Sequence, residues 1–190
     1  TISTSGTLDR ETIARYTLNV TANDGLQTSH CMVRINVNDV NDNAPKFDQS
    51  FYSFDIPEDT AIGTTVGSVR ADDLDVGLNG DVLYSLTAGW GNDTFELDPV
   101  KGTFKLLRVL DFEETWDFVL MLWNSLYTLQ VLAYDAGTEP QTSSILVFFN
   151  VKDTNDHIPE FEQGEYNAAV YENVTIGTSV LQVEALDIDS

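Results

Sequence analysis

The chain has 190 residues, among them 31 acidic and 9 basic side chains, and its formal charge is −22. This charge excludes nucleic acids and anionic membrane surfaces as partners, because binding to either requires positive charge. Cys31 is the only cysteine, so no disulfide can form within the chain. A compact fold with this charge repels itself unless bound cations offset the excess.

Short segments rich in β-branched and aromatic residues alternate with clusters of Gly, Pro, Asn and Asp in the middle of the chain. Such segments predict β-strands separated by turns. The expected strands cover residues 51–56, 65–71, 82–86, 95–97, 103–107, 127–134 and 145–151. About seven short strands in roughly 105 residues favour a Greek-key β-sandwich, and no long helical period interrupts them. We therefore expect an all-β fold.

An internal repeat divides the chain. Residues 39–45 (DVNDNAP) recur 114 positions later as residues 153–159 (DTNDHIP). We call residues 39–43, with the side chains gathered around them, the first junction, and residues 153–157, with the side chains around them, the second junction. The repeat predicts the end of one unit at residues 1–43, a whole unit at 44–157 and the start of a third at 158–190. The sequence is therefore expected to be a fragment of a longer array.

Nine residues within 115–126 break the register of the repeat. Four residues separate Glu11 from Tyr16, whereas thirteen separate Glu113 from Tyr127. An exposed apolar loop of this composition, with two tryptophans, is typical of a docking site for a partner. Two other interpretations stay open, namely a loop folded back over the sandwich and a gene-model error that retains non-coding sequence.

The acidic residues stand where the expected strands end. They form a glutamate after the first strand, an Asp-x-Glu turn, an Asp-x-Asp turn and a lone aspartate before a glycine: Glu58 and Glu172; Asp9-x-Glu11 and Asp111-x-Glu113; Asp73-x-Asp75 and Asp187-x-Asp189; Asp24 and Asp135. Oxygen ligands kept in register across a repeat indicate a hard cation, and Ca²⁺ accepts about six to eight of them. Zinc would need clustered His or Cys, and an EF-hand loop is excluded because Gly77 holds its fifth position.

Taken together, these motifs resemble the extracellular cadherin repeat. The interdomain segment, the Asp-x-Asp turn followed by Gly77-x-Asn79-Gly80, the Leu-Asp-x-Glu turn and the Ala-x-Asp turn all stand in the family's order. The resemblance covers the whole chain apart from the insertion, and it is closer to nonclassical members of the protocadherin or Fat and Dachsous type. It implies tandem seven-stranded, immunoglobulin-like β-sandwiches, one complete and two partial.

In that family each junction between repeats binds calcium ions through residues of both repeats and of the linker. Carried over by position, the resemblance implies the following ligands at the first junction, with main-chain carbonyls for Val40 and Asn79: Asp9, Glu11, Asp39, Val40, Asn41, Asp42, Asn43, Asp73, Asp75, Asn79 and Asp135. The glutamate that would complete this set is expected before Thr1.

At the second junction the resemblance implies these ligands: Glu58, Asp111, Glu113, Asp153, Asn155, Asp156, His157, Asp187 and Asp189. His157 departs from the family, which usually has Asn there, and imidazole suits transition metals better than calcium. The last carboxylate of this set is expected beyond Ser190. Asp24 and Glu172 would serve an earlier and a later junction.

The function implied is that of a calcium-dependent adhesion or signalling receptor ectodomain, stiffened by calcium ions. Its partners would be other cadherin ectodomains, homophilic or heterophilic, and its parent a single-pass protein of the plasma membrane. Trp90, Trp116 and Trp123 lie inside a repeat, so none matches the exchanged tryptophan of classical cadherins. Sequons at Asn19, Asn92 and Asn173 are compatible with a secreted glycoprotein.

Two rival functions come from other classes. One is a secreted calcium-binding spacer or a carbohydrate-binding β-sandwich without an adhesive role. The other is a hydrolase that uses Asp73 with Asp75, or Asp111 with Glu113, as acid and base. Because these acids recur in each unit, whereas a catalytic pair should be single, we expect neither enzymatic activity nor a small-molecule substrate.

Overall fold

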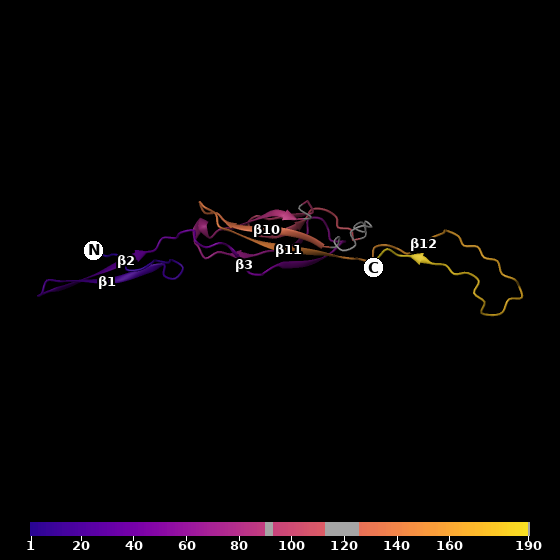
Figure 1. Ribbon diagram of the computed structural model, residues 1–190, viewed down its shortest axis with the longest axis horizontal. Helices are drawn as coiled ribbons and strands as arrows, with labels where there is room; N and C mark the ends of the chain where they lie inside the picture. Colours follow the sequence, from indigo (N-terminus) through magenta and orange to yellow (C-terminus); the bar gives the residue numbers. More distant parts are fainter. Residues whose placement is uncertain (90–92, 113–125, 190) are drawn as a thin grey trace.

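The computed structural model describes residues 1–89, 93–112 and 126–189 (Figure 1). Within these ranges the elements are β-strands and one short 3₁₀ turn, η1 (Gly77–Asn79), so the all-β expectation is confirmed. In the same ranges no helix is long and apolar enough to cross a membrane. The insertion expected at 115–126, apart from Leu126, lies outside the described residues, as do Glu113, Trp90 and the sequon residue Asn92.

The central part of the chain is a two-layered sandwich. Its larger sheet has the order β4-β11-β10-β7, and its smaller sheet has the order β5-β9-β8. The strands of these sheets are β4 (Tyr52–Pro57), β11 (Thr142–Lys152), β10 (Leu126–Asp135) and β7 (Val82–Gly89), with β5 (Thr65–Ser68), β9 (Thr103–Leu106) and β8 (Phe95–Leu97). All pairs are antiparallel except β4 with β11, which run parallel.

The core follows from the period-two pattern of the two longest strands. Leu129, Val131 and Ala133 of β10 are buried and alternate with partly exposed residues, because successive side chains point to opposite faces. Aromatic rings fill the space between the sheets. Phe149 of β11 stacks on Phe95 of the opposite sheet with 4.3 Å between ring centroids. Such pairs contribute about 0.5–1.5 kcal/mol beyond their buried area.

The 114-residue register of the sequence is also a register of strand pairs. The two-residue ladder of β3 (Lys46–Phe47) with β6 (Ala71–Asp72) returns as β12 (Glu160–Phe161) with β13 (Ala185–Leu186). The hairpin of β1 (Arg15–Asn23) and β2 (Thr28–Asn36) pairs Tyr16 with Ile35, and β10 and β11 pair their counterparts Tyr127 and Phe149, which lie 111 and 114 positions later. These flanking strands are largely exposed, since few other described elements cover them.

One expected strand is divided in the structure. Residues 65–71 form β5 and β6 with a break between them, because the intervening amides find partners outside a strand ladder. Val69 N–H donates to the Gly102 carbonyl over 2.8 Å, and Arg70 N–H donates to the Tyr52 hydroxyl over 3.0 Å. The chain thereby passes from the small sheet to β3. The expectation of one continuous strand was wrong. The composition of residues 69–71 is ordinary for a strand, so nothing in the sequence marked the break.

Candidate metal centres

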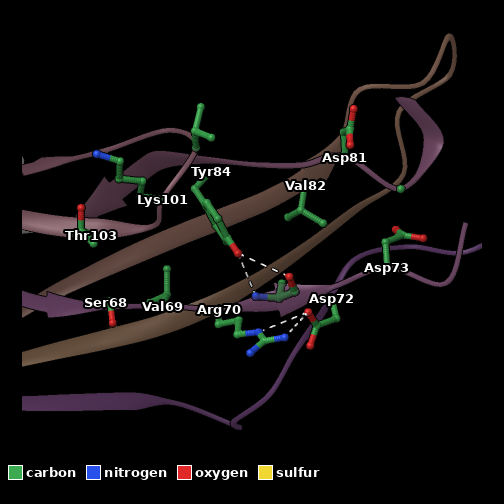
Figure 2. Close-up of a pocket in the computed structure, with 13 residues that line it drawn as sticks. Ser68, Val69, Arg70, Asp72, Asp73, Asp81, Val82, Tyr84, Lys101 and Thr103 are labelled. Carbon is green, nitrogen blue, oxygen red and sulfur yellow. Dashed lines mark hydrogen bonds and ion pairs between the residues drawn. The ribbon is translucent and has the colours of Figure 1, made fainter. Parts of the chain in front are cut away.

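A hydrogen bond in the core positions one side of the first junction. The buried Tyr84 hydroxyl of β7 accepts the Ala71 N–H over 2.9 Å, which fixes β6 directly before the Asp-x-Asp turn. Figure 2 shows this contact in the wall of an open pocket of about 570 Å³, whose lining also includes Arg70, Asp72 and Asp73. Asp73 therefore leaves the sheet at a defined point, at the end of the sandwich that faces the first junction.

The carboxylate of Asp75 is the centre of the first junction. It is 6% exposed, and its two oxygens accept the Asn43 backbone N–H over 3.1 Å and the Asn43 side-chain amide over 2.7 Å. The same amide donates to Asp42 Oδ1 over 2.9 Å. Carboxylate oxygens of Glu11, Asp42 and Asp75 lie within 4.8 Å of one another. Three segments far apart in the sequence thus converge on one point.

Asp39 forms the side of the first junction that faces the preceding unit. Its Oδ2 accepts the Asn79 amide over 2.9 Å and the Val76 N–H over 3.2 Å, and its Oδ1 pairs with Arg10. Partial burial acts to raise the pKa of Asp39, but these hydrogen bonds and the Arg10 charge lower it below its usual value. Arg10 also pairs with Glu11 and donates to the Leu74 carbonyl, so it links the two units.

Asp135 is fully buried at the base of the first junction. Its Oδ1 accepts the Gly137 N–H and the Asn41 amide, over 2.8 and 2.9 Å, and its Oδ2 accepts the Gln141 N–H over 2.6 Å. The Asn41 amide also donates to the Glu139 carbonyl over 2.8 Å. All of these donors to Asp135 are neutral N–H groups, and none of them belongs to a cationic side chain.

Two buried oxygens test whether a cation fits the first junction. Among the described residues, Asn41 Oδ1 and Asp73 Oδ2 are inaccessible to solvent and have no hydrogen-bond partner. Burial, followed by the nearby charges of Asp75 and Asp135, raises the pKa of Asp73. Buried polar atoms are almost always paired, and unpaired ones call for an explanation such as an ion. Oxygens that lack hydrogen-bond donors, beside crowded carboxylates, are ligands of the kind that calcium binds.

The remaining predicted ligands of the first junction are arranged differently. Asp9 is exposed, and it accepts the Thr12 N–H and hydroxyl over 3.2 and 2.7 Å in a local turn. The Val40 carbonyl accepts the Asp42 N–H over 2.9 Å. The side chain of Asn79 contacts Asp39, while the role expected for Asn79 was that of its main-chain carbonyl. Like the other ligand assignments at this junction, these three stay predictions.

Glu58 is the buried carboxylate of the second junction. It is 4% exposed, its Oε2 accepts the Phe112 N–H over 2.6 Å and its Oε1 accepts the Thr154 N–H over 2.6 Å. Glu58 therefore ties the Asp-x-Glu turn to the linker, across 54 and 96 positions of sequence. Of that turn, Asp111 is described and exposed, whereas Glu113 lies outside the described residues.

His157 contacts two carboxylates at the second junction. Its Nδ1 lies 2.8 Å from Asp156 Oδ1 and 2.8 Å from Asp189 Oδ1, and its backbone N–H donates to Asp189 Oδ2 over 3.0 Å. Asp189 N–H in turn donates to Asp187 Oδ1 over 3.1 Å. The end of the chain returns beside the start of β12, which brings Asp189 to the linker (Figure 1). Asp153 is half-buried and Asn155 is exposed.

Sequence reasoning missed several contributors to the first junction, among them Arg10 and the Glu139 carbonyl. Arg10 carried a signal, because it is a rare base placed between the two acids of the Asp-x-Glu turn. Gly137 was already part of the Ala-x-Asp-x-Gly motif, and the structure gives the reason for the glycine, since a Cβ there would lie 2.5 Å from Asn41 Nδ2. The Glu139 carbonyl carried none, because a backbone acceptor has no sequence signature.

Comparisons with known proteins place the chain in a family. The model of the Cadherin domain matches residues 52–152, just over half of the chain. Protocadherin Fat 4 of Homo sapiens is 41% identical over 182 residues, and Cadherin EGF LAG seven-pass G-type receptor 1 of Mus musculus is 38% identical over 195. These matches cover 96% and 100% of the chain, but only 3% and 6% of the relatives. The chain therefore spans a few per cent of their length.

Solved structures agree with this placement. The crystal structure of human CDH23 EC21-23 is 33% identical, with a TM-score of 0.77, and the match covers 96% of this chain and 57% of that one. Protocadherin Gamma B2 extracellular cadherin domains 3-6 are 27% identical, with a TM-score of 0.84 over 98% and 46% of the two chains. The chain therefore belongs to the cadherin superfamily and carries its extracellular repeats.

Proposed function

We propose that the chain is a segment of a calcium-dependent adhesion or signalling receptor ectodomain in which calcium at both junctions stiffens the repeat array. Its division at residues 43/44 and 157/158 belongs to this proposal. The observation that carries it is the pair of buried, unpartnered oxygens, Asn41 Oδ1 and Asp73 Oδ2, at the first junction. Cadherin repeats generally bind calcium, and this donor set supports the same property here.

At the first junction we assign the ions to eleven residues. Bound calcium would supply positive charge that offsets the crowded carboxylates and completes the coordination of their free oxygens. Asp75, Asp42 and Glu11 already converge. Burial, and after it the nearby charges of Asp75 and Asp135, raise the pKa of Asp73, and a bound cation would offset both effects. The proposed ligands are Asp9, Glu11, Asp39, Val40, Asn41, Asp42, Asn43, Asp73, Asp75, Asn79 and Asp135.

At the second junction the assigned set is shorter by two residues. Glu58 supports it, because a buried carboxylate that accepts two amide N–H groups still offers lone pairs to a cation. The proposed ligands are Glu58, Asp111, Glu113, Asp153, Asn155, Asp156, His157, Asp187 and Asp189. At both junctions the chain's own residues hold the linker between two units, so loss of the cation should leave a linker whose charges repel one another.

The direct test is the thermal unfolding of the chain as free calcium rises from a chelated state to about 10 mM, with magnesium as the comparison ion. At an extracellular-type Kd of about 10⁻⁴ M, one site would add roughly 2.7 kcal/mol to the free energy of unfolding. Magnesium requires a stricter octahedron, so its effect should be smaller. An equal effect of both ions would contradict a built calcium site.

A matched pair of variants locates the effect. Asp42→Asn with Asp75→Asn removes two proposed ligands of the first junction and should abolish much of the calcium-dependent rise in Tm. Glu96→Gln removes the charge of an exposed residue in β8, away from both junctions, and should keep that rise. If both variants respond to calcium as the original chain does, the ligand assignment is wrong.

Adhesion by contact between cadherin ectodomains is the second half of the proposal. The solved cis-dimer of Protocadherin gammaB7 EC3-6 is an example of contact between cadherin ectodomains in a relative. Beads that carry this chain, or a longer array that contains it, should aggregate with one another or with beads that carry a different cadherin, and only when calcium is present. The two arms separate homophilic from heterophilic contact. No aggregation in either arm would favour the spacer function instead.

We place the parent protein at the extracellular face of the plasma membrane. Its number of membrane crossings is open, because the relatives include seven-pass receptors by name. The carbohydrate-binding alternative needs an exposed aromatic beside polar groups. The pocket of Figure 2 does not favour it, because Tyr84, the aromatic residue of its described lining, is 6% exposed. We propose no enzymatic activity, since the acids recur at both junctions.

A further inference from the structure

We propose that Asp156, His157 and Asp189 form a transition-metal site, selective for Zn²⁺ or a similar ion, that the first junction lacks. The inference rests on the proposed function because these three residues are also proposed calcium ligands of the second junction, so the two ions would compete for them. It departs from the expectation that zinc needs clustered His or Cys, since zinc also binds one imidazole together with carboxylates. It follows from a single exchange of residue type between two otherwise matching sites. At the first junction the corresponding residues are Asp42, Asn43 and Asp75, each 114 positions earlier.

The two sites share their hydrogen-bond geometry. Asn43 Nδ2 lies 2.9 Å from Asp42 Oδ1 and 2.7 Å from Asp75 Oδ1, and Asn43 N–H donates to Asp75 Oδ2 over 3.1 Å. The corresponding distances around His157 are 2.8, 2.8 and 3.0 Å. The imidazole Nδ1 therefore occupies the position of the amide nitrogen between the same two carboxylates.

The chemistry of that nitrogen differs between the two sites. An amide nitrogen has no available lone pair, so at the first junction it can only donate a hydrogen bond. A neutral imidazole that carries its hydrogen on Nε2 presents a lone pair at Nδ1, which is a preferred ligand atom for zinc, copper and nickel. At the second junction, one nitrogen and two carboxylates thus converge, with ligand atoms within 4.8 Å of one another.

The separations suit a tetrahedral ion. Zinc binds nitrogen and oxygen at about 2.0–2.2 Å, so neighbouring ligand atoms of a tetrahedron lie roughly 3.3 Å apart. Widening the present contacts of 2.8 Å by about half an ångström meets this requirement through side-chain rotation. The three protein ligands leave the fourth position to water, as in open zinc sites.

One ligand of the site is buried and the other two are accessible to solvent. The Asp189 side chain is 5% exposed and is anchored by the His157 N–H, whereas the side chains of His157 and Asp156 are 40% and 53% exposed. A cation can therefore reach the ligand atoms from solvent without opening the sandwich. The exposed faces of two ligands also allow the small shifts that coordination requires.

The test is a titration of the whole chain in calcium-free buffer with Co²⁺, whose visible absorption strengthens in tetrahedral sites, followed by displacement with Zn²⁺. The variant that tests the proposal is His157→Asn. It has the residue type of the first junction with its amide donor, so it should fold. Even outer-shell changes cost about 10–100-fold in metal affinity, so loss of a direct ligand should weaken Co²⁺ binding by at least the lower figure.

The result that overturns the inference is equal Co²⁺ binding by the original chain and by His157→Asn, since the ion would then bind to carboxylates alone. Absence of a tetrahedral spectrum in the original chain would overturn it as well. The calcium-dependent Tm of both proteins is measured in parallel. If calcium has no effect while Co²⁺ binding depends on His157, the proposed function fails and the zinc site stands. The opposite pair of results rejects the zinc site alone.

Discussion

Adding a methyl group at Gly137 tests the side-chain packing of the first junction. An ideal Cβ at this position lies 2.5 Å from Asn41 Nδ2 and 2.8 Å from both Asn79 Oδ1 and Asp135 Oδ1. The backbone of Gly137 has an ordinary, negative φ, so alanine brings no backbone strain of its own. The substitution Gly137→Ala therefore tests only the space between three side chains, two of which, Asn41 and Asp135, we assign to the calcium site.

The expected cost follows from the contacts that must give way. Asn41 Nδ2 is the nearest atom, and moving it disturbs its hydrogen bonds to Asp135 Oδ1 and to the Glu139 carbonyl. Each such bond contributes about 0.5–1.5 kcal/mol, and overpacking of a tight site costs roughly 1–3 kcal/mol. We expect Gly137→Ala to lower the free energy of unfolding by about 1–3 kcal/mol. In a domain of about 100 residues, each 1 kcal/mol lowers Tm by roughly 4–8 °C.

The assay is urea unfolding followed by circular dichroism, with and without calcium. Gly164→Ala is the matched control, because a Cβ at Gly164 meets no atom within 4 Å, so the free energy of unfolding should stay nearly constant or rise slightly. Gly137→Ala should also lose part of the calcium-dependent stabilisation, since the side chains it displaces are proposed ligands. Equal stability of the two alanine variants in both conditions would refute the described packing of this site.

Three further predictions concern positions outside that contact. Glu58→Gln should lower the free energy of unfolding by about 1.5–3 kcal/mol in calcium-free urea melts, because the amide group turns a donor toward one of two backbone N–H groups; an unchanged midpoint would contradict the buried geometry. Tyr84→Phe should cost about 1–3 kcal/mol in the same assay, because it leaves a buried backbone N–H unsatisfied, and stability equal to the original chain would show that this N–H finds another partner. Backbone N–H groups lower the pKa of Asp98 below its usual 3.8, so the stability that its charge contributes is present above pH 3.8 and is lost as the pH falls through the lower folded-state pKa. In acid unfolding, the difference between the original chain and Asp98→Asn should therefore shrink below about pH 4, and a constant difference would argue against this linkage.

The sequence alone was sufficient for the sheets of the central unit. Alternating residues such as Leu129, Val131 and Ala133 predict one buried face, and the structure has it. What the sequence could not predict is where a strand changes partner. The break between β5 and β6 depends on amide partners such as the Gly102 carbonyl, which lies 33 positions from Val69. No local propensity encodes a contact of this kind.

At the candidate site, too, some features could be predicted from the sequence and others could not. Carboxylates such as Asp75 and Glu58 were predictable because their place in turns repeats with the strand register. Their hydrogen-bond partners were not, since most of these are backbone N–H groups that every residue carries. The exchange of Asn43 for His157 was visible in the sequence, but only the structure gives the imidazole nitrogen the same two carboxylate neighbours as the amide.

The parallel pair of β4 and β11 has a mechanical consequence. The chain enters the larger sheet through β4 and leaves it through β11, and these strands lie side by side from Tyr52 opposite Val147 to Pro57 opposite Lys152. A pull on the two ends of the repeat therefore slides one strand along the other and strains the whole ladder at once, in shear. Within the larger sheet the force passes through this pair of strands at one edge, while β3, which precedes β4, carries part of it into the β3–β6 ladder.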